Sequence, residues 1–181
     1  MKMDKYNFTT KMYAACSNDE LRPIANCVHF ENGFILASNG IIAIRQSLEY
    51  HSILSPELLD GNSLHRENYK NIMQFEEAIA TQEGIHCKNK DGRIAFFEYF
   101  DRKKEKIPNF DEIFKKYKAK GVDFIGFNPE QMRILMLSLY CPGGYVRVNF
   151  GGIDKIMFID VPGIERQEAI LMPVLVEGTL F

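Results

Sequence analysis

Residues that can bind metals or perform nucleophilic catalysis occur along the sequence, but their spacing matches no known motif. The four cysteines, Cys16, Cys27, Cys87 and Cys141, lie far apart, and no Cys-x-x-Cys or His-x3-His pair is present. His86 is adjacent to Cys87, so on a strand the two side chains point to opposite faces and cannot hold one ion together. The nucleophile elbow Gly-x-Ser-x-Gly, the zinc motif His-Glu-x-x-His and the phosphate-binding glycine loops are also missing. We therefore expect no metal, no cofactor and no enzyme activity, with an active site assembled from distant segments as the alternative.

Cations that could contact a polyanion are concentrated in one segment. Between Asp101 and Lys120 the chain has eight Lys or Arg and four Asp or Glu, which gives this segment a charge of +4. Because the whole chain has a net charge of −2, the remainder carries −6. A basic segment on an acidic body suits a polyanionic partner such as nucleic acid, and a solvated linker is the alternative.

The composition is typical of a soluble globular protein. The chain has 181 residues, of which 46% are hydrophobic and 25% charged, and these values exclude disordered and low-complexity classes. No segment approaches the roughly 18 consecutive apolar residues that a membrane helix needs, and residues 1–10 lack the apolar core of a signal peptide. We therefore expect a cytoplasmic protein with reduced cysteines and no membrane contact, built as one large domain or as one domain and part of a second.

Three segments repeat one pattern of a short strand, an amphipathic helix and strands joined by tight turns. In the first, a helix capped by Thr9 or Thr10 precedes apolar runs that turn at Asn32-Gly33 and at Asn39-Gly40. Asn-Gly between apolar runs is typical of a type I′ turn, in which both central residues have positive φ. The two turns predict a three-stranded antiparallel meander, on which we interpret His29 as a hydrogen-bonded strand residue rather than a catalytic base.

The second and third segments continue the pattern. A helix is predicted over residues 64–77 and a hairpin turn at Asp91-Gly92. The third segment opens with a strand from Val122 and a helix over residues 128–140, capped by Asn128 and with a proline at its first position. This helix is apolar nearly all round, so we expect most of its circumference to be buried.

The chain is therefore expected to be an α+β protein of repeated β-α-β-β units, with antiparallel sheets and helices on one face. We assign two units to a first domain over residues 1–110, followed by a basic connector over residues 111–121. A third unit, equivalent to half a domain, occupies residues 122–176, and residues 177–181 form a tail.

Several segments resemble the bacterial DNA polymerase III β sliding clamp. The sequences LRPIANCVHF (residues 21–30) and FILASNGIIA (residues 34–43) are similar to the start of a clamp domain, where Arg-Pro and a strand precede an Ala-Thr-Asp-Gly-like turn. AILMPVLV (residues 169–176) is similar to the Met-Pro strand that ends the clamp. KIPNFDEI (residues 106–113) and Phe127-Asn128 match two further segments, and all of them occur in the clamp's order.

The resemblance implies a ring whose helices line a central channel, whose sheets form the outer shell, and whose surface has a pocket for short apolar peptides. In the clamp, this pocket combines the Thr-Asp-Gly turn with the Met-Pro strand. Methionine and aliphatic side chains suit such a pocket, because they form an adaptable apolar groove. An ordinary turn beside a core strand is the alternative. The implied pocket residues are Ser38, Asn39, Gly40, Ile41, Ile42, Met172, Pro173 and Val174.

The resemblance also implies sequence-independent contact with duplex DNA. Arg22 matches the arginine of the clamp's Arg-Pro, which touches the DNA backbone. The other predicted contacts are cations of the expected helices, namely Lys11, Arg66, Lys70 and Arg133. So few phosphate contacts give weak, salt-sensitive binding, which a ring tolerates because it encircles the duplex. A full clamp chain has three domains of two units each, so three units would need further copies to close a ring, and we expect a homo-oligomer.

These observations favour a non-enzymatic, clamp-like platform for replication or repair proteins. One alternative is a module of the same fold that binds a protein partner and never encircles DNA, and another is a hydrolase or transferase with an unrecognised site. The terminal Leu180-Phe181 is similar to the apolar end of peptides that dock in clamp pockets. We therefore predict that the tail occupies its own or a neighbour's pocket, with a frayed terminus as the alternative.

Overall fold

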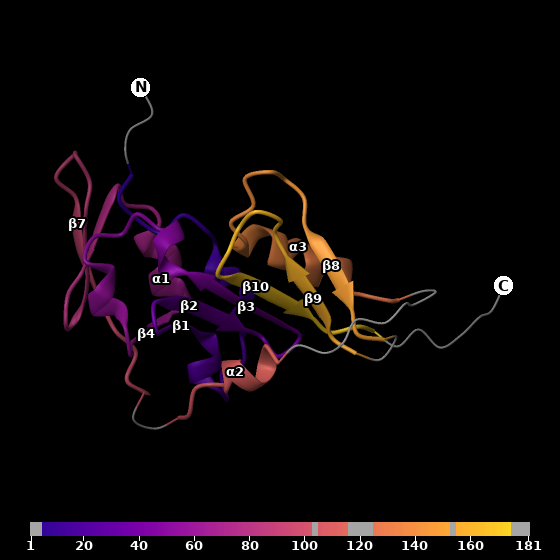
Figure 1. Ribbon diagram of the computed structural model, residues 1–181. Coiled ribbons are helices and arrows are strands. Elements are labelled where there is room, and N and C mark those ends of the chain that lie inside the picture. Colours follow the sequence, from indigo (N-terminus) through magenta and orange to yellow (C-terminus); the bar gives the residue numbers. More distant parts are fainter. Residues whose placement is uncertain (1–4, 103–104, 116–124, 153–154, 175–181) are drawn as a thin grey trace.

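The computed structural model describes residues 5–102, 105–115, 125–152 and 155–174 of the chain (Figure 1). The predicted tail, the beginning of the strand predicted from Val122 and the second half of the predicted connector lie outside these residues. In the part that is described, no helix is long and apolar enough to cross a membrane.

Seven antiparallel strands form the main sheet, in the order β4-β1-β2-β3-β10-β9-β8. Their bounds are β1 Cys27–Glu31, β2 Phe34–Ser38, β3 Ile42–Ser47, β4 Ser63–His65, β8 Arg147–Phe150, β9 Met157–Asp160 and β10 Gln167–Leu171. β3 and β10 pair from Gln46 opposite Gln167 to Ile42 opposite Leu171. Since β10 comes from the third predicted unit, this pairing joins that unit to the first in one continuous sheet.

Three further strands form a separate sheet in the order β5-β6-β7, with bounds β5 Glu77–Ala80, β6 Gly84–Lys88 and β7 Ile94–Glu98. Gly84 is required where β6 meets β7, because a Cβ atom there would lie 2.3 Å from the carbonyl oxygen of Phe97. β7 is an edge strand whose outer face exposes 78% of Ile94 and 40% of Phe96. In Figure 1, β7 lies at one end of the molecule and β8, the edge of the main sheet, lies at the other.

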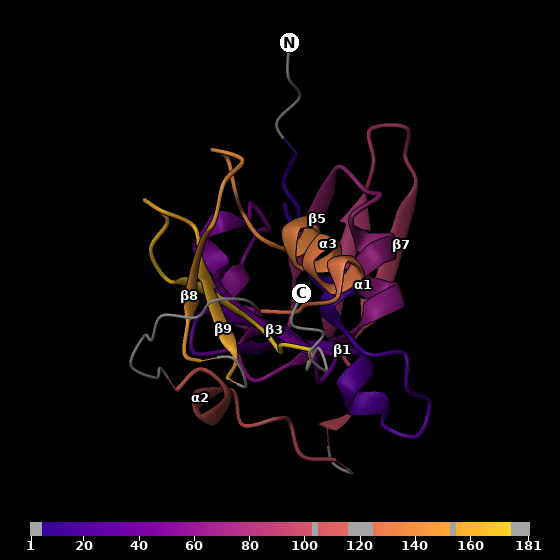
Figure 2. The ribbon, with the colours of Figure 1, turned by 90° about the vertical axis from the view of Figure 1, so that its right-hand side faces the viewer.

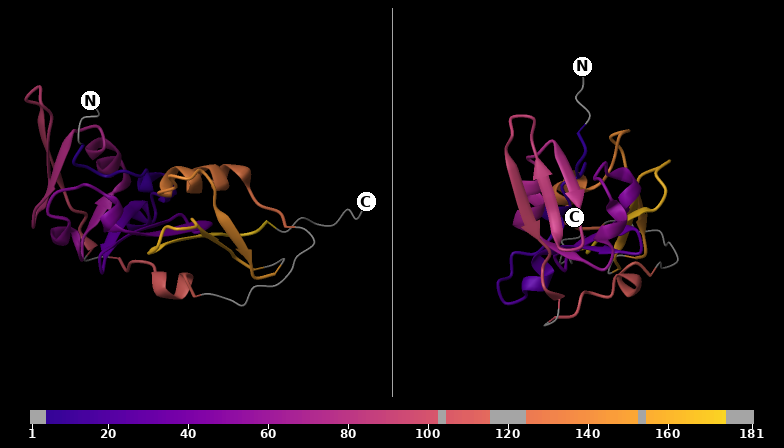
Figure 3. Two further views of the ribbon diagram at one scale, coloured as in Figure 1. Left: turned by 45° about the horizontal axis from the view of Figure 1, so that its top comes forward. Right: turned by 90° about the vertical axis from the view of Figure 1, so that its left-hand side faces the viewer.

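The helices are short and cover the two faces of the main sheet unequally. Their bounds are η1 Met12–Ala15, η2 Pro23–Asn26, η3 Leu48–Tyr50, η4 Pro56–Leu59, α1 Arg66–Ile72, α2 Phe110–Ile113 and α3 Pro129–Ser138, where η marks a 3-10 helix. η1 contacts both α1 and α3 and also β2 and β3. Figures 2 and 3 show α1 and α3 on one side of the main sheet and α2 on the other.

Alternation along the strands explains why both faces of the sheet are covered. Ile35 and Ile42 point into the large core beneath η1, α1 and α3, whereas Leu36, Ala43 and Ile170 pack against Phe110 and Phe114 on the opposite face. A sheet that is buried on both faces has strands with continuous apolar runs, as in β2. The predicted class, an α+β protein with antiparallel sheets and the main helices on one face, is confirmed.

The helix predicted behind Thr9 and Thr10 is only the 3-10 turn η1, because neither threonine caps it. The hydroxyl of Thr9 donates instead to the carbonyl of Tyr50 at 2.6 Å, and that of Thr10 donates to Gln46 Oε1 at 2.8 Å. The N-cap position falls on Lys11, whose side chain makes no capping bond.

Three further predictions of local structure are wrong. The helix predicted over residues 64–77 is shorter, because β4 ends at His65 and β5 begins at Glu77. The turn at Asn39-Gly40 is not of type I′, since Gly40 has a φ of +87° but Asn39 is not in the positive-φ region. α3 is also less buried than its composition predicts: Leu135 is buried, whereas Leu137 is 38% exposed, because α3 packs against its neighbours on one side only.

Candidate functional site

The turn between β2 and β3 is fixed by its own side chains. Asn39 Oδ1 accepts hydrogen bonds from the backbone N–H groups of Ile41 and Ile42, both at 2.9 Å. The hydroxyl of Ser38 donates to the carbonyl of Ile42 at 2.8 Å and accepts from the N–H of Gly40 at 3.1 Å. Asparagine side chains form turns of this kind by hydrogen bonding to the backbone two residues further on. This side-chain turn stands where the sequence predicts a type I′ backbone turn.

The segment after β10 lies directly beside this turn. The N–H of Met172 donates to the carbonyl of Ile41 at 2.9 Å, and the N–H of Val174 donates to the carbonyl of Gly126 at 2.8 Å. Three apolar side chains remain on the surface, where Ile41 is 44% exposed, Met172 43% and Val174 49%. We call these three residues the seam patch, because they lie where the first and third units meet.

α3 holds the turn from its other side. The side-chain amide of Asn39 donates to Gln131 Oε1, in the first turn of α3, at 2.9 Å. α3 itself begins at a capped N-terminus, because Asn128 Oδ1 accepts from the N–H of Glu130 at 2.9 Å. The turn, β10 and α3 are thus connected by hydrogen bonds into one rigid surface.

The structure brings the two predicted pocket segments together, although they are separated by more than 120 residues in the sequence. Ser38, Asn39 and Gly40 form the turn, and Pro173 lies between two residues of the seam patch. Ile42 is 1% exposed and belongs to the core, so it supports the seam patch from below and offers no surface.

Three of the predicted DNA-contacting cations are engaged in ion pairs. The guanidinium of Arg133 binds Glu130 at 2.6 Å, that of Arg66 lies 3.5 Å from Glu67, and the ammonium of Lys70 lies 3.9 Å from the same glutamate. These pairs lower the net positive charge of α1 and α3. The pairs of Lys70 and Arg133 are exposed and cost little to break.

The other two predicted cations, Lys11 and Arg22, are exposed and make no ion pair with the residues that the structure describes. Lys11 lies at the start of η1, and its N–H donates to the carbonyl of Leu137 near the end of α3. Arg22 occupies the N-cap position of η2. The five predicted cations therefore come from the two helices α1 and α3 and from the N-cap positions of η1 and η2.

A hollow of about 330 Å³ lies next to the turn. We call it the arginine hollow, because Arg66 and Arg133 line it together with Tyr13, Asn39, Ile41 and Gln131. Two of its residues, Asn39 and Ile41, belong to the predicted peptide pocket, and two others belong to the predicted DNA contacts. From the sequence, the peptide pocket and the DNA contacts are predicted as separate sites, and nothing in the spacing of their residues indicates that they share one cavity.

The described part of the basic segment lies on the opposite face of the main sheet from α1 and α3. Phe110 and Phe114 anchor α2 there, and Arg102 donates from Nε to Ser63 Oγ at 2.7 Å near the edge strand β4. The segment also contacts η2, where Glu105 Oε2 accepts from the N–H of Ile24 at 3.2 Å.

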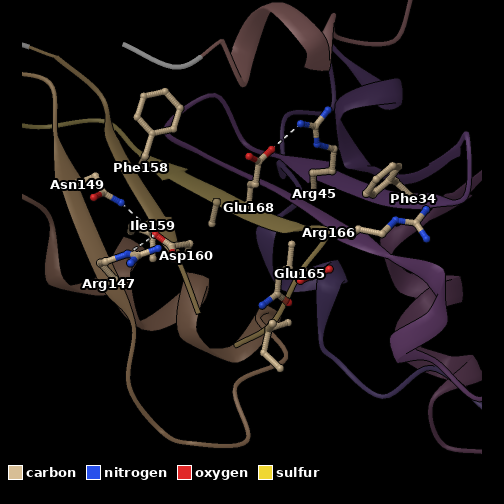
Figure 4. A pocket seen from close by; sticks show the side chains of 13 residues that line it. Phe34, Arg45, Arg147, Asn149, Phe158, Ile159, Asp160, Glu165, Arg166 and Glu168 are labelled. Carbon is tan, nitrogen blue, oxygen red and sulfur yellow. Dashed lines mark hydrogen bonds and ion pairs between the residues drawn. The ribbon is translucent and has the colours of Figure 1, made fainter. Parts of the chain in front are cut away.

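A larger groove of about 660 Å³ runs over β3, β10, β9 and β8 (Figure 4). Sequence analysis did not predict it. Its three arginines are paired with carboxylates: Arg45 with Glu168, Arg147 with Asp160, and Arg166 with Glu49. The guanidinium groups of Arg45 and Arg166 also lie 5.5 Å and 5.0 Å from the centre of the Phe34 ring.

A serine–histidine pair exists, but it is sealed inside the protein. Ser63 Oγ and His29 Nδ1 are 2.7 Å apart, and the two residues are 0% and 1% exposed. Ser63 Oγ also accepts a hydrogen bond from Arg102 Nε at 2.7 Å. Burial, and then the nearby Arg102, lower the pKa of His29 to about 3. This pair stabilises β1 and β4, and no substrate can reach it.

Three of the four cysteines, Cys16, Cys27 and Cys87, are buried. Burial raises the pKa of the Cys27 and Cys87 thiols to about 12 and raises that of Cys16 further, which keeps all three protonated. Among the described residues, no group of three or more His, Cys, Asp or Glu side chains is placed to hold a metal ion. The surface features of the seam are therefore the strongest candidate for a functional site.

The fold defined by these sheets and helices is that of the bacterial DNA polymerase III β sliding clamps, as the sequence resemblance predicts. The clamp of Bacillus subtilis matches with a TM-score of 0.62 and 14% identity, over 92% of this chain and 61% of the clamp chain. The β clamp of Helicobacter pylori, in a structure with a DNA ligase peptide bound, matches with a TM-score of 0.63 and 12% identity, over 91% and 61%. DNA polymerase III subunit beta of Pseudomonas aeruginosa matches with a TM-score of 0.59 and 10% identity, over 92% and 62%.

The match extends over nearly the whole chain but only about three fifths of each clamp. No protein-family model matches the sequence. No curated protein matches it either. The similarity to the clamps is therefore one of fold, at 10–14% sequence identity.

Proposed function

We propose that this chain is a non-enzymatic, clamp-like platform of the cytoplasm that binds short apolar peptides of replication or repair proteins. One observation carries the proposal: the pairing of β3 with β10 places Met172 beside Ile41, and both side chains stay exposed together with that of Val174, two residues further along the chain. Exposed apolar side chains on a hydrogen-bonded, rigid support are typical of peptide-binding grooves. That the solved clamp of Helicobacter pylori was crystallised with a DNA ligase peptide supports this assignment.

The first prediction tests the seam patch. A labelled, acetylated and amidated peptide with the sequence Gln-Gln-Gly-Leu-Phe should bind the wild-type protein in fluorescence anisotropy. Ile41→Glu or Met172→Glu should weaken it by about 30-fold, because a charge replaces an apolar anchor worth about 2 kcal/mol.

Leu58→Glu is the matched control, since Leu58 is 37% exposed on η4, away from the seam patch. It should leave peptide affinity unchanged. Equal losses of peptide affinity in the Leu58 and Ile41 variants, or no loss of affinity in either seam-patch variant, would show that the peptide does not bind at the seam patch.

We further propose that copies of the chain assemble and contact duplex DNA through the helix face. In the described part of the molecule, the outer edges of β7 and β8 have no strand partner, and they lie at opposite ends (Figure 1). Unpaired edges are templates for strand addition, so head-to-tail copies could extend both sheets. The proposed DNA contacts are Lys11, Arg22, Arg66, Lys70 and Arg133.

The second prediction concerns retention on DNA. An assembled ring should stay on circular duplex and slide off linear duplex, and light scattering should show more than one copy at the same concentration. The double variant Lys11→Ala, Arg22→Ala should lower the slope of log affinity against log salt by about 0.9 for each lost phosphate contact. Lys115→Ala, an exposed cation beside α2 on the other face, should leave it unchanged.

The second candidate function is a clamp-fold module that binds a protein partner without encircling DNA. The ion pairs of Arg66, Lys70 and Arg133 with glutamates favour it, because they reduce the charge available to phosphates. This function is indicated if the peptide binds normally while neither circular nor linear duplex is retained.

A further inference from the structure

The arginine hollow combines positive charge with a floor of uncharged groups. Of the residues that the structure describes, its lining includes Arg66 and Arg133 but no aspartate or glutamate. Asn39 and Gln131 are already bonded to each other across its wall. A ligand that enters the hollow therefore meets two guanidinium groups and no opposing carboxylate within the lining.

Each arginine keeps one terminal nitrogen without an acceptor among the described residues. Arg66 Nη1 donates to the carbonyl of Ser17 at 3.0 Å and Nε lies 3.5 Å from Glu67, which leaves Nη2. Arg133 binds Glu130 through Nε at 2.7 Å and Nη2 at 2.6 Å, which leaves Nη1. In addition, Arg66 Nε is buried and makes no hydrogen bond. Both side chains are thus positioned by the protein and retain capacity to donate.

The hollow is continuous with the seam patch through Ile41. Ile41 lines the hollow, and its carbonyl accepts the hydrogen bond from Met172 of the seam patch. One short ligand can therefore contact both features if it carries an anionic group next to apolar groups. A peptide with an acidic residue a few positions from its apolar anchors has this chemistry, whereas a DNA backbone has the anion but no apolar side chain.

We propose that the arginine hollow binds a carboxylate of the partner peptide, so that the seam selects acidic–apolar peptides over neutral ones. This inference rests on the proposed peptide-binding function and adds the chemical class of the ligand. A carboxylate is the natural acceptor for two guanidinium groups, because charge-assisted hydrogen bonds to it are stronger than neutral ones.

The test compares two acetylated, amidated peptides, Glu-Glu-Gly-Leu-Phe and Gln-Gln-Gly-Leu-Phe, by fluorescence anisotropy. Two adjacent acidic residues allow for either register in the hollow. The Glu peptide should bind the wild-type protein about tenfold more tightly. Arg133→Gln should reduce this preference to threefold or less, and so should 0.5 M salt, because screening weakens exposed charge pairs.

Arg147→Gln is the matched control. Its side chain is 65% exposed against 60% for Arg133, and it is also paired with an acidic residue, but it lies on β8 outside the hollow. The control should keep the tenfold preference. Arg66→Lys is a second variant, which keeps the charge but loses the guanidinium group. It should reduce the tenfold preference for the Glu peptide over the Gln peptide.

Three results would overturn the inference in distinguishable ways. Equal binding of the two peptides, with Ile41→Glu weakening both, rejects the carboxylate site and leaves the proposed function standing. Equal binding together with poorer duplex retention in Arg133→Gln assigns the arginines to DNA phosphates instead. If neither peptide binds the wild-type protein, the proposed function and this inference both fail.

Discussion

At pH 4.5 the protein should have lost about 5 kcal/mol of the stability that it has at pH 7. Two buried histidines cause this loss. His29 is 1% exposed and His51 is 8% exposed, and burial lowers the pKa of each to about 3 from the usual 6.5. The nearby Arg102 lowers the pKa of His29 further in the same direction.

The direction of this pH dependence follows from the difference in histidine pKa between the folded and the unfolded protein. In the folded protein both imidazoles stay neutral down to a pH of about 3, whereas in the unfolded chain they take up protons below 6.5. The stabilisation is therefore complete above pH 6.5 and is lost as the pH falls toward 3. Each histidine costs about 1.4 kcal/mol per pH unit within this window, so stability is expected to fall while most carboxylates are still ionised.

Urea unfolding at a series of pH values measures this dependence. His51→Gln should roughly halve the slope of stability against pH between 4 and 6, because one of the two groups no longer titrates. His86→Gln is the control, since His86 is exposed on β6 and should leave the slope unchanged. A slope in His51→Gln equal to that of the wild type would show that other groups control acid stability.

Gln167→Leu should destabilise the protein by about 3–5 kcal/mol, because it leaves several buried polar groups unpaired. Gln167 is 3% exposed and its carboxamide accepts from the N–H of Tyr140 at 2.8 Å and donates to the carbonyl of the same residue at 3.0 Å. Gln46, also buried, donates to Gln167 and accepts from Thr10. This chain of hydrogen bonds connects the first unit to α3 and β10.

Because the same contacts hold β10 against β3, Gln167→Leu should also reduce binding of the Leu-Phe peptide at temperatures where the protein is still folded. Thermal unfolding by circular dichroism and anisotropy at the same temperature separate the two effects. Gln82→Leu, at an exposed position between β5 and β6, is the control and should change stability by less than about 0.5 kcal/mol. A loss below about 1 kcal/mol in Gln167→Leu would mean that leucine packing replaces the lost hydrogen bonds.

Features that depend on neighbouring residues were predictable from the sequence. Asn32-Gly33 forms the expected turn with both residues at positive φ, 52° and 75°. α3 begins at the predicted Asn128 cap. In both cases the side chain that determines the local backbone is within three residues of the structure that it determines.

Features that depend on distant partners were not predictable from pattern alone. Thr9 and Thr10 have the chemistry of helix caps, but hydrogen bonds to Tyr50 and Gln46 compete for their hydroxyls and leave only a 3-10 turn. The Ser63–His29 pair joins two strands that no spacing connects. An amphipathic or apolar pattern identifies a strand but not the strand that it pairs with.

In the candidate site, too, features set by neighbouring residues were predictable and features set by distant partners were not. The juxtaposition of the turn with Met172 was expected from the family resemblance and not from residue spacing, and its role in binding stays a prediction. The ion pair of Glu130 with Arg133 could have been anticipated, since residues three apart on a helix are neighbours. That Arg66 and Arg133 share a hollow with Ile41 required the three-dimensional arrangement of α1, α3 and the turn.

The position of β10 in the sheet has a consequence for how the protein folds during its synthesis. Of the described strands β10 comes last in the sequence, yet it pairs with β3, one of the first. A nascent chain on the ribosome can fold its early hairpins before β10, Met172 and Val174 have been synthesised. Products of interrupted translation that stop before Gln167 would therefore lack the strand that completes the proposed peptide site.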